Sequence, residues 1–243
     1  MKQRKIAVIA GTSDATDWIR SLPETDSVTA FVATPYGKEI LAGTNCTVHV
    51  GRLDAAGFLE ALTGFDEVVD ASHPFAVVVT ETVKAVCQAK QIPYTRISRP
   101  TLHYDYEKLH VVSSKEAAAD WLCSCTGNLF FTVGIQTLPF YAAAVTDFSH
   151  RAFARVLDTA ASRQAAAAIP ATFWFAMPPY SIAETVAYLQ EHQISVLISK
   201  DSGARGGVPE KIQAAKQVGI PVLLIQSPEQ NSDNLHKKYH ETF

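Results

Sequence analysis

The stretch from Ile194 to Ile225 constrains the fold of this chain most, because it carries the pattern of a complete strand–helix–strand unit. Ser195 to Ser199 is an apolar run rich in β-branched residues and too short for a helix, which is typical of a buried strand. A charged loop follows, and then an amphipathic helix that begins near Pro209 and is expected to end at Gly219. Val222 to Ile225 is the second strand. This pattern predicts an open parallel sheet, in which ligands bind beyond the carboxyl ends of the strands.

The loop after that first strand is the strongest candidate for a functional site. It begins Lys200-Asp201-Ser202-Gly203 and continues through Arg205 to a pair of glycines, Gly206 and Gly207. A loop with a purely structural role rarely needs cationic, acidic and hydroxyl side chains together with three glycines. We therefore predict that this loop belongs to a binding or catalytic site.

The N-terminus shows a related pattern of strand, glycine turn and helix. Lys5 to Ala10 is a predicted strand, Gly11-Thr12-Ser13-Asp14 is the turn, and Ala15 to Leu22 is a predicted helix. Backbone N–H groups at the start of that helix, with the hydroxyls of Thr12 and Ser13, can hold a phosphate. The turn lacks the G-x-G-x-x-G dinucleotide fingerprint, and an ordinary turn capped by Ser13 fits the residues equally well.

The loop after the second predicted strand, Val28 to Ala33, would meet the adenosine ribose if a dinucleotide bound to this fold. In dinucleotide-binding folds an acid there contacts the ribose 2′-hydroxyl, and a base accommodates a 2′-phosphate. This chain has Thr34, Tyr36 and then Lys38. The residues therefore lean toward NADPH, with NADH possible.

Other polar residues follow further predicted strands. His73 follows the strand from Glu67 to Ala71, where it is either a functional side chain or a hydrogen-bonded loop anchor. Arg52 follows the strand from Thr47 to Val50 and is either a surface residue or an anion ligand. Two more arginines, Arg96 and Arg99, lie at the end of a strand predicted from Ile92 to Ile97. They suit an anionic ligand or a domain junction.

The alternation of strands and helices restarts after residue 100. We predict an α/β fold of two Rossmann-like lobes with parallel sheets that face an interdomain cleft. Residues 1–100 would form the cofactor-binding domain, and residues 101–243 would complete the active site. The segment from Tyr104 to Val112 is expected to be a crossover between the domains. The tail from Ser227 to Phe243 is expected to be short helix or frayed.

Composition excludes several classes of protein. A net charge of -3 over 243 residues argues against a general nucleic-acid binder. No apolar run is long enough to span a membrane and no signal peptide is visible, so we expect a cytoplasmic protein without a membrane partner. The four cysteines form no C-x-x-C pair and predict neither a metal site nor a disulfide framework. The oligomeric state is not fixed by the sequence.

Six segments, taken in order along almost the whole chain, match the motifs of one family. They are Gly11–Ala15 (GTSDA), Asp70–Ala76 (DASHPFA), Arg96–Pro100 (RISRP), Thr132–Gly134 (TVG), Ala154–Leu157 (ARVL) and Lys200–Ile212 (KDSGARGGVPEKI). The last segment and the His-Pro-Phe motif are specific, whereas the first is generic. Through these segments the chain resembles the precorrin-6A and cobalt-precorrin-6A reductases of cobalamin biosynthesis.

Three positions depart from the family pattern. Ser72 stands where the family usually has threonine, and Ser98 stands where it usually has an acid. Both changes are mild. Pro178 replaces the glycine of a Gly-Pro-Phe-Ser turn, and proline cannot adopt the conformations that only glycine reaches. This third departure therefore bears on the path of the backbone.

The resemblance implies an NAD(P)H-dependent oxidoreductase that delivers a hydride to one ring double bond of a tetrapyrrole and a proton to the neighbouring carbon. It implies catalytic roles for Lys200, Asp201, Ser202 and His73, with the proton coming from Asp201, His73 or water. The residues expected to bind the cofactor are Gly11, Thr12, Ser13, Asp14, Thr34, Thr132, Gly134 and Gly203. The residues expected to bind the substrate carboxylates are Arg52, Arg96, Arg99, Arg155 and Arg205.

Two other classes of protein remain as alternatives. The same turns could serve a nucleotide-dependent transferase or another tetrapyrrole enzyme, such as a methyltransferase that uses S-adenosylmethionine. A two-lobed small-molecule binding protein could also carry them. It would bind a ligand without turnover and would not need the pair Lys200 and Asp201.

Overall fold

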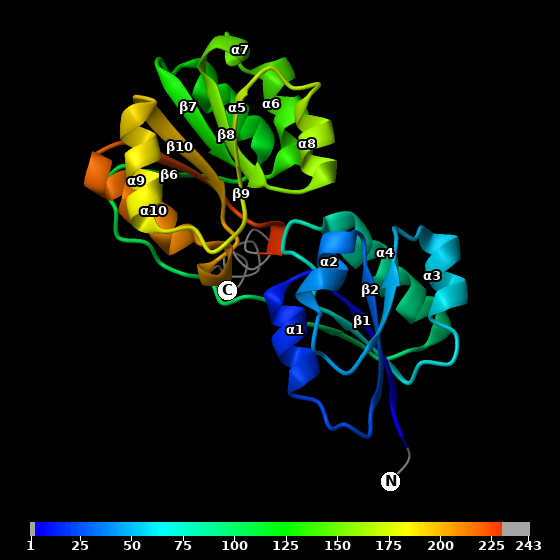
Figure 1. Cartoon of the computed structure of the whole chain (residues 1–243). Coiled ribbons are helices and arrows are strands. Elements are labelled where there is room, and N and C mark those ends of the chain that lie inside the picture. Colours follow the sequence, from blue (N-terminus) through cyan, green and yellow to red (C-terminus); the bar gives the residue numbers. More distant parts are fainter. Residues whose placement is uncertain (1–2, 230–243) are drawn as a thin grey trace, which may run out of the picture. The chain divides into compact units, whose positions relative to one another are not determined.

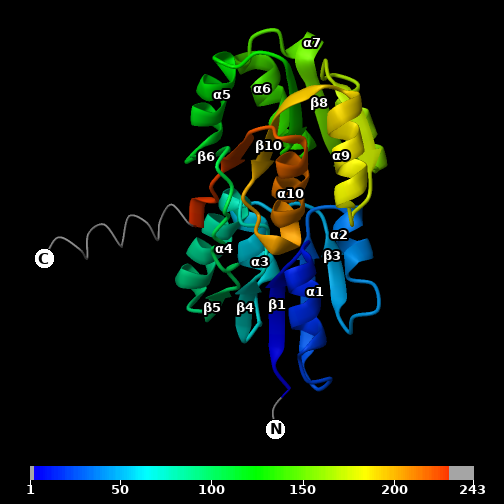
Figure 2. The same ribbon diagram turned by 90° about the vertical axis from the view of Figure 1, so that its left-hand side faces the viewer.

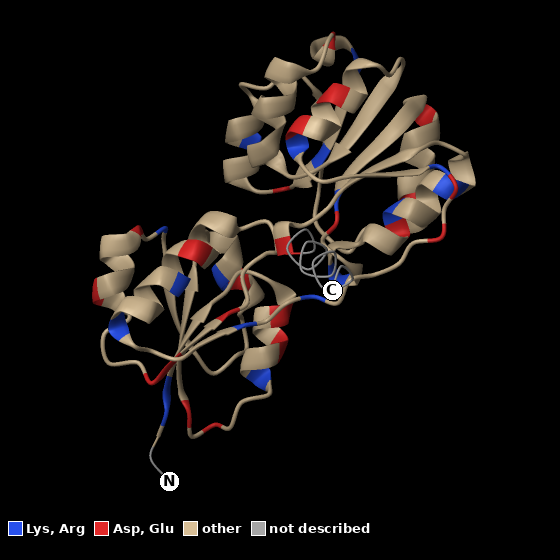
Figure 3. Cartoon of the chain, turned by 180° about the vertical axis from the view of Figure 1, so that it is seen from behind, with Lys and Arg blue, Asp and Glu red and all other residues tan. Residues whose placement is uncertain are grey.

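The computed structural model describes residues 3–229, and the chain divides into two compact units, Met1–Arg99 and Pro100–Phe243 (Figure 1). Charged residues lie mostly on helices and loops, and the strands are largely without them (Figure 3). This distribution is expected of parallel sheets that are covered on both faces.

The first unit is a five-stranded parallel sheet with helices on both faces. Its strands are β1 (Lys5–Ile9), β2 (Ser27–Val32), β3 (Thr47–Val50), β4 (Glu67–Asp70) and β5 (Tyr94–Arg96), and its helices are α1 (Ser13–Arg20), α2 (Pro35–Ile40), α3 (Ala55–Ala61) and α4 (Val77–Lys90). The order of the strands across the sheet is β3-β2-β1-β4-β5.

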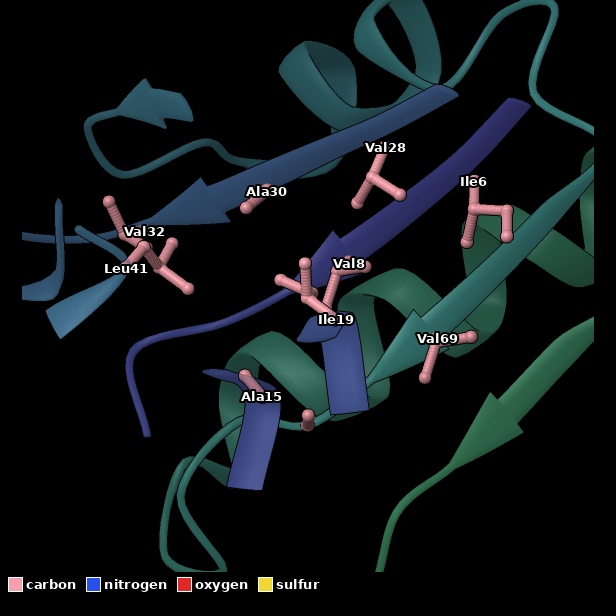
Figure 4. Close-up of a cluster of buried hydrophobic side chains, with 10 residues drawn as sticks. Ile6, Val8, Ala15, Ile19, Val28, Ala30, Val32, Leu41 and Val69 are labelled. Carbon is pink, nitrogen blue, oxygen red and sulfur yellow. The ribbon is translucent and has the colours of Figure 1, made fainter. Parts of the chain in front are cut away.

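Strand β1 is buried on both faces because its side chains alternate between two cores. Ile6 and Val8 pack in the cluster that contains Ala15 and Ile19 of α1 (Figure 4). The intervening residues of β1 pack on the opposite face, against α3 and α4. This double burial explains why β1 reads as a continuous apolar run.

The second unit is a six-stranded parallel sheet, also covered on both faces. Its strands are β6 (Leu109–Val112), β7 (Asn128–Thr132), β8 (Ala152–Leu157), β9 (Thr172–Ala176), β10 (Ile194–Lys200) and β11 (Val222–Ile225), and its helices are α5 (Lys115–Cys123), η1 (Ile135–Thr137), α6 (Leu138–Ala144), α7 (Phe148–Arg151), α8 (Ala160–Ala166), α9 (Ile182–Glu191), η2 (Ala204–Gly206) and α10 (Val208–Val218). Helices α9 and α10 lie side by side against one face (Figures 1 and 2).

The two sheets share one strand order. The second sheet runs β6-β11-β10-β7-β8-β9. Read from its other edge, the second sheet begins β9-β8-β7-β10-β11, which corresponds strand by strand to β3-β2-β1-β4-β5 of the first sheet. Strand β6 adds a sixth strand beside β11. The shared order is that of the first five strands of a Rossmann-type sheet, so the predicted α/β fold of two Rossmann-like lobes is confirmed.

Strand β6 corrects one prediction. The segment from Tyr104 to Val112 was expected to be a crossover, but Leu109–Val112 pairs in parallel with β11. This strand lies at the edge of its sheet, and Val111 is 49% exposed. A half-exposed edge strand mixes polar and apolar residues, so the sequence does not show the apolar run of a central strand.

The turns after β1 and β2 correct two further expectations. Thr12, and not Ser13, caps α1, because its hydroxyl accepts a hydrogen bond from the backbone N–H of Ala15. The expected loop after β2 is the start of α2, capped by Thr34 with Pro35 in the first turn. The short helices α6 and α7 were not predicted. Of the predicted tail, residues 230–243 lie outside the described residues.

Candidate active site

Each sheet has one point at which its strand order reverses, which we call its switch point. It lies between β1 and β4 in the first unit and between β7 and β10 in the second. In doubly wound sheets, ligands bind beyond the carboxyl ends of the strands at this point. The motifs singled out from the sequence follow these four strands. The turn from Gly11 to Asp14 follows β1, His73 follows β4, Gly134 follows β7, and the loop from Asp201 to Gly207 follows β10.

At the first switch point, the backbone of Gly11 is open to a ligand. Its φ of +111° is a conformation that residues with a side chain rarely adopt, and a Cβ placed on it would meet nothing within 4 Å. None of the backbone N–H groups of Gly11, Thr12 and Ser13 donates a hydrogen bond to another of residues 3–229. Three successive N–H groups at a helix start form an arrangement that suits a phosphate.

The hydroxyl of Thr12 ties the two sides of this switch point together. It donates a hydrogen bond to the carbonyl of Ala71 at 2.7 Å and accepts one from the N–H of Ala15 at 3.2 Å. The single hydroxyl proton is therefore engaged within the protein. A phosphate in this turn would be held by backbone N–H groups and by the exposed Ser13, whereas Thr12 holds the turn in place.

Arg99 lies at the start of α1 because it pairs with Asp14. Its Nε is 2.8 Å and its Nη2 is 2.5 Å from the same carboxylate oxygen of Asp14. Both side chains are largely buried. This pair puts a guanidinium beside the turn that suits an anion.

Arg96 is paired within the first unit by the buried carboxylate of Asp70. The Nη1 of Arg96 lies 2.8 Å from Oδ1 of Asp70, whose side chain is fully buried. The same carboxylate accepts hydrogen bonds from the N–H of Ser72 and from the hydroxyls of Thr80 and Tyr94, at 2.8 to 2.9 Å. Burial and the Asp70 carboxylate raise the pKa of Tyr94. This network fixes the end of β4, from which the His73 segment leaves.

Three other predicted residues of the first unit lie at its surface. His73 is exposed, and its Nδ1 accepts a hydrogen bond from the N–H of Phe75 at 3.2 Å. Thr34 is exposed and caps α2. Arg52 is exposed after β3. The first switch point therefore brings together Gly11, Thr12, Ser13, Asp14 and Arg99, while Thr34 and Arg52 lie at neighbouring strand ends.

At the second switch point, Lys200 joins the end of β10 to η1, the short helix that follows β7. Its Nζ donates a hydrogen bond to the hydroxyl of Thr137 at 2.7 Å. Burial, assisted by the charge of Lys115, lowers the pKa of Lys200 to about 8. The hydroxyl of Thr132 donates to the carbonyl of Ile198 at 2.9 Å and joins β7 to β10. A partly desolvated ammonium thus lies where a ligand of this unit would bind.

The glycine-rich loop after β10 is held by its own hydrogen bonds. Oδ1 of the buried Asp201 accepts from the N–H of Gly203 at 3.2 Å and from the hydroxyl of Tyr104 at 2.9 Å. The N–H groups of Gly206 and Gly207 donate to carbonyls of the same loop. Unlike the turn at Gly11, this loop uses its N–H groups internally, so it presents side chains at a fixed position.

Arg155 is a buried cation surrounded by aromatic rings. The residue is 5% exposed, its Nη1 donates to the hydroxyl of Thr185 at 2.9 Å, and its guanidinium carbon lies 3.8 Å from the ring centre of Tyr180 and 5.0 Å from that of Trp174. Within residues 3–229 no carboxylate forms an ion pair with it. Burial lowers the pKa of Arg155 to about 10. The remaining guanidinium N–H groups suit a carboxylate ligand. Arg205, in contrast, is exposed on η2.

Three residues of the second unit were not predicted from the sequence. Tyr104 and Thr137, which hold Asp201 and Lys200, lie far from them in the chain. Lys211 is buried on α10, and its position in the sequence could have drawn attention to it. It stands three residues after Val208 and one before Ile212, on the face of the helix that packs in the core. A lysine on such a face is unusual.

Among residues 3–229, no three His, Cys, Asp or Glu side chains gather where they could hold a metal ion. Over the same residues, no helix combines the length and the apolar character needed to cross a membrane.

The fold and the site together define an α/β protein of two Rossmann-like units with polar residues gathered at both switch points. The model of the precorrin-6x reductase CbiJ/CobK family matches residues 5–242. This chain therefore belongs to that family of oxidoreductases, which confirms the resemblance seen in the motifs.

Individual relatives agree with this assignment. The chain is 32% identical to a cobalt-precorrin-6A reductase of Methanothermobacter thermautotrophicus, over 95% of this chain and 78% of the relative. It is 27% identical to a cobalt-precorrin-6A reductase of Priestia megaterium, over 97% of this chain and 95% of the relative. It is 28% identical to a precorrin-6A reductase of Rhodococcus erythropolis, over 92% and 89%.

A solved structure of a CobK precorrin-6A reductase is similar in fold. It matches with a TM-score of 0.77 and 22% sequence identity, over 93% of this chain and 89% of the solved chain. At this identity the likeness supports the fold of the two units.

Proposed function

We propose that this chain reduces one ring double bond of the precorrin-6A macrocycle with NADPH, as a step of cobalamin biosynthesis. The carbon–carbon double bond gains a hydride at one carbon and a proton at the other, and the cofactor is oxidised. The observation that carries the proposal is that the family's motifs occupy both switch points. The cobalt-containing substrate is the first to test, because two of the relatives named above are cobalt-precorrin-6A reductases. A cytoplasmic location is part of the proposal.

The first unit is proposed to bind the cofactor, whose reduced nicotinamide supplies the hydride. The open N–H groups from Gly11 to Ser13 would hold its phosphates, with the Asp14–Arg99 pair beside them. Thr34 would border the adenosine ribose, and Lys38 on α2 favours a 2′-phosphate and hence NADPH. Thr132, Gly134 and Gly203 remain proposed as further contacts to the cofactor.

The second unit is proposed to bind the macrocycle and to perform the chemistry. Lys200 would place a positive charge near the reacting double bond and stabilise negative charge that develops there. The proton would come from Asp201 or from a bound water oriented by Ser202 or Asp201. Tyr104 holds the Asp201 carboxylate in one position for this role.

Among the arginines proposed to bind the substrate carboxylates, Arg155 is the first choice. Arg96 and Arg99 already hold carboxylates of this chain. Arg155 is buried, stacked on aromatic rings and without an ion pair in the described chain, so a carboxylate ligand would complete its surroundings. Arg52 and Arg205 are exposed and would serve as outer contacts.

A calorimetric titration of the purified protein with NADPH and with NADH tests the choice of cofactor. Saturable binding of NADPH at a lower dissociation constant than that of NADH is expected. The titration is repeated in the presence of the tetrapyrrole, because substrate and cofactor can bind in an obligatory order. Absence of nicotinamide binding under both conditions would remove the reductase proposal, and binding of S-adenosylmethionine instead would indicate a methyltransferase.

Replacing Gly11 by valine is expected to weaken NADPH binding by about tenfold, or about 1.4 kcal/mol. The added side chain would occupy the open space where a ligand approaches the backbone. The measurement is the dissociation constant from the same titration.

Gly64→Val is the matched control for backbone strain. Gly64 has a φ of +83°, and an added Cβ there also meets nothing within 4 Å, but it lies in the turn before β4 and away from the proposed cofactor turn. It should lower stability and leave the affinity for NADPH unchanged. An unchanged affinity in Gly11→Val would place the cofactor elsewhere.

Lys115→Gln is expected to move the alkaline limb of the pH–rate profile to higher pH. If Lys200 acts as a cation, turnover falls as the pH rises through its pKa of about 8. Lys115 lowers that pKa, so removal of its charge raises it. Lys216→Gln, an exposed change on α10, should leave the limb where it is. A limb that moves downward or stays fixed in Lys115→Gln contradicts the role given to Lys200.

A further inference from the structure

Lys211 is a buried lysine that the proposed chemistry does not use. It lies in the first turns of α10, and the whole residue is 8% exposed. Its neighbours on the same helix, Val208, Ile212, Ala214 and Ala215, belong to the apolar core of the second unit. A charged side chain in such a place is costly and requires specific partners.

The partners of Lys211 are the two ends of the glycine-rich loop. Its Nζ lies 3.2 Å from the hydroxyl of Ser199, the residue directly before Lys200. It also donates a hydrogen bond at 2.9 Å to the carbonyl of Gly206, near the end of the loop. The hydroxyl of Ser199 in turn lies 3.2 Å from the carbonyl of Lys200 and donates to it. One ammonium thus joins the entry and the exit of the segment that carries Lys200, Asp201 and Ser202.

The charges around Lys211 do not favour its ammonium. Burial, assisted by the nearby Arg155 and partly offset by the exposed Glu210, lowers the pKa of Lys211 to about 7. A buried leucine or methionine would avoid this cost. The fold therefore places a costly buried charge where the hydrogen bonds of Lys211 hold the candidate active-site loop. Exceptions to the rule that cores are apolar are typical of functional sites.

We propose that Lys211 is a positioning residue, whose ammonium holds both ends of the loop from Lys200 to Gly206 and thereby fixes the placement of Lys200 and Asp201. Its effect on turnover rests on the proposed reductase function. Whether Lys211 holds the loop does not depend on that function and can be tested without substrate.

The test compares Lys211→Met with Lys216→Met. Methionine fills a similar volume without hydrogen-bond donors, and Lys216 is exposed on the same helix. Hydrogen exchange of the peptide covering residues 200–207, measured by mass spectrometry, should become faster in Lys211→Met and stay unchanged in Lys216→Met. Thermal stability should stay the same or rise in Lys211→Met, because an ammonium leaves the core.

Kinetics with NADPH and the tetrapyrrole give the second readout. Misplacement of a catalytic group by about 1 Å can cost about 100-fold in rate, so kcat should fall by about 10- to 100-fold in Lys211→Met. The KM for NADPH should not change. If Lys211 were needed only for stability, Lys211→Met would lower Tm and leave loop exchange and kcat at wild-type values. That result would overturn the proposal.

A second variant covers the case in which Lys211→Met fails to fold. Ser199→Ala removes one of the two acceptors and leaves the bond to Gly206. It should give a smaller increase of exchange in the same peptide, and unchanged exchange would overturn the proposal. If wild-type protein does not reduce the macrocycle, the proposed function fails, and exchange alone decides whether Lys211 holds the loop.

Discussion

Lys200→Met is expected to lower kcat by about 100-fold or more, which is the usual effect of removing one group that stabilises developing charge. The side chain lies at the end of β10 at the switch point of the second unit, bonded to Thr137. Methionine keeps most of its volume and removes its charge. The affinity for NADPH, measured by titration, should stay near the wild-type value, because the cofactor phosphates are proposed to bind in the first unit.

Thr137→Val is a milder change to the same contact. It removes the hydroxyl that accepts the bond from Lys200 and leaves the charge in place. We expect a smaller loss of kcat than in Lys200→Met, with the same unchanged affinity for NADPH. Full turnover in Lys200→Met would remove the glycine-rich loop from the active site.

Asp70→Asn is expected to lower the free energy of unfolding by about 3 to 5 kcal/mol, the usual cost of breaking a buried ion pair by removing one partner. The Asp70 side chain is fully buried and accepts from four donors, contributed by Ser72, Thr80, Tyr94 and Arg96. An amide can accept through one oxygen only and adds two donors of its own. Donors around it would therefore be left without an acceptor, and the guanidinium of Arg96 would lose its counter-charge.

Urea unfolding measures this effect, with fluorescence and circular dichroism recorded together because two units need not unfold in one transition. Glu60→Gln, which neutralises an exposed carboxylate on α3, is the control and should change stability by less than about 0.5 kcal/mol. A loss below 1 kcal/mol in Asp70→Asn would mean that the network around Asp70 does not hold the end of β4.

The central strands could be predicted from the sequence because they are buried on both faces. The range of the central strand β11 agrees with the prediction residue for residue, and β1 ends one residue before the predicted Ala10. Such strands carry unbroken apolar, β-branched runs, which leave little choice of structure. The edge strand β6 has one open side, so its residues follow no such run.

The placement of the candidate residues at strand ends could also be predicted, because it follows from the order of strands and loops along the chain. The hydrogen-bond partners of these residues could not be predicted. Thr12 contacts Ala71 across 59 residues, and Tyr104 contacts Asp201 across 97. Contacts of this kind depend on the order of the strands in the sheet, which local patterns do not contain. For the same reason Arg96 and Arg99 read as ligands for an anion, although each has a carboxylate partner within its own unit.

The most direct test of the central claim is transfer of deuterium from labelled NADPH to cobalt-precorrin-6A. NADPH that carries deuterium at both hydrogen positions of the reactive carbon of the nicotinamide is incubated with the purified protein and the macrocycle, and the product is analysed by mass spectrometry. The proposed function predicts a product that has gained one deuterium from the cofactor and one hydrogen from water, at the two carbons of one former double bond. A parallel incubation with metal-free precorrin-6A shows which form is preferred. If both ligands bind and neither macrocycle gains deuterium, the chain is not a reductase of these compounds.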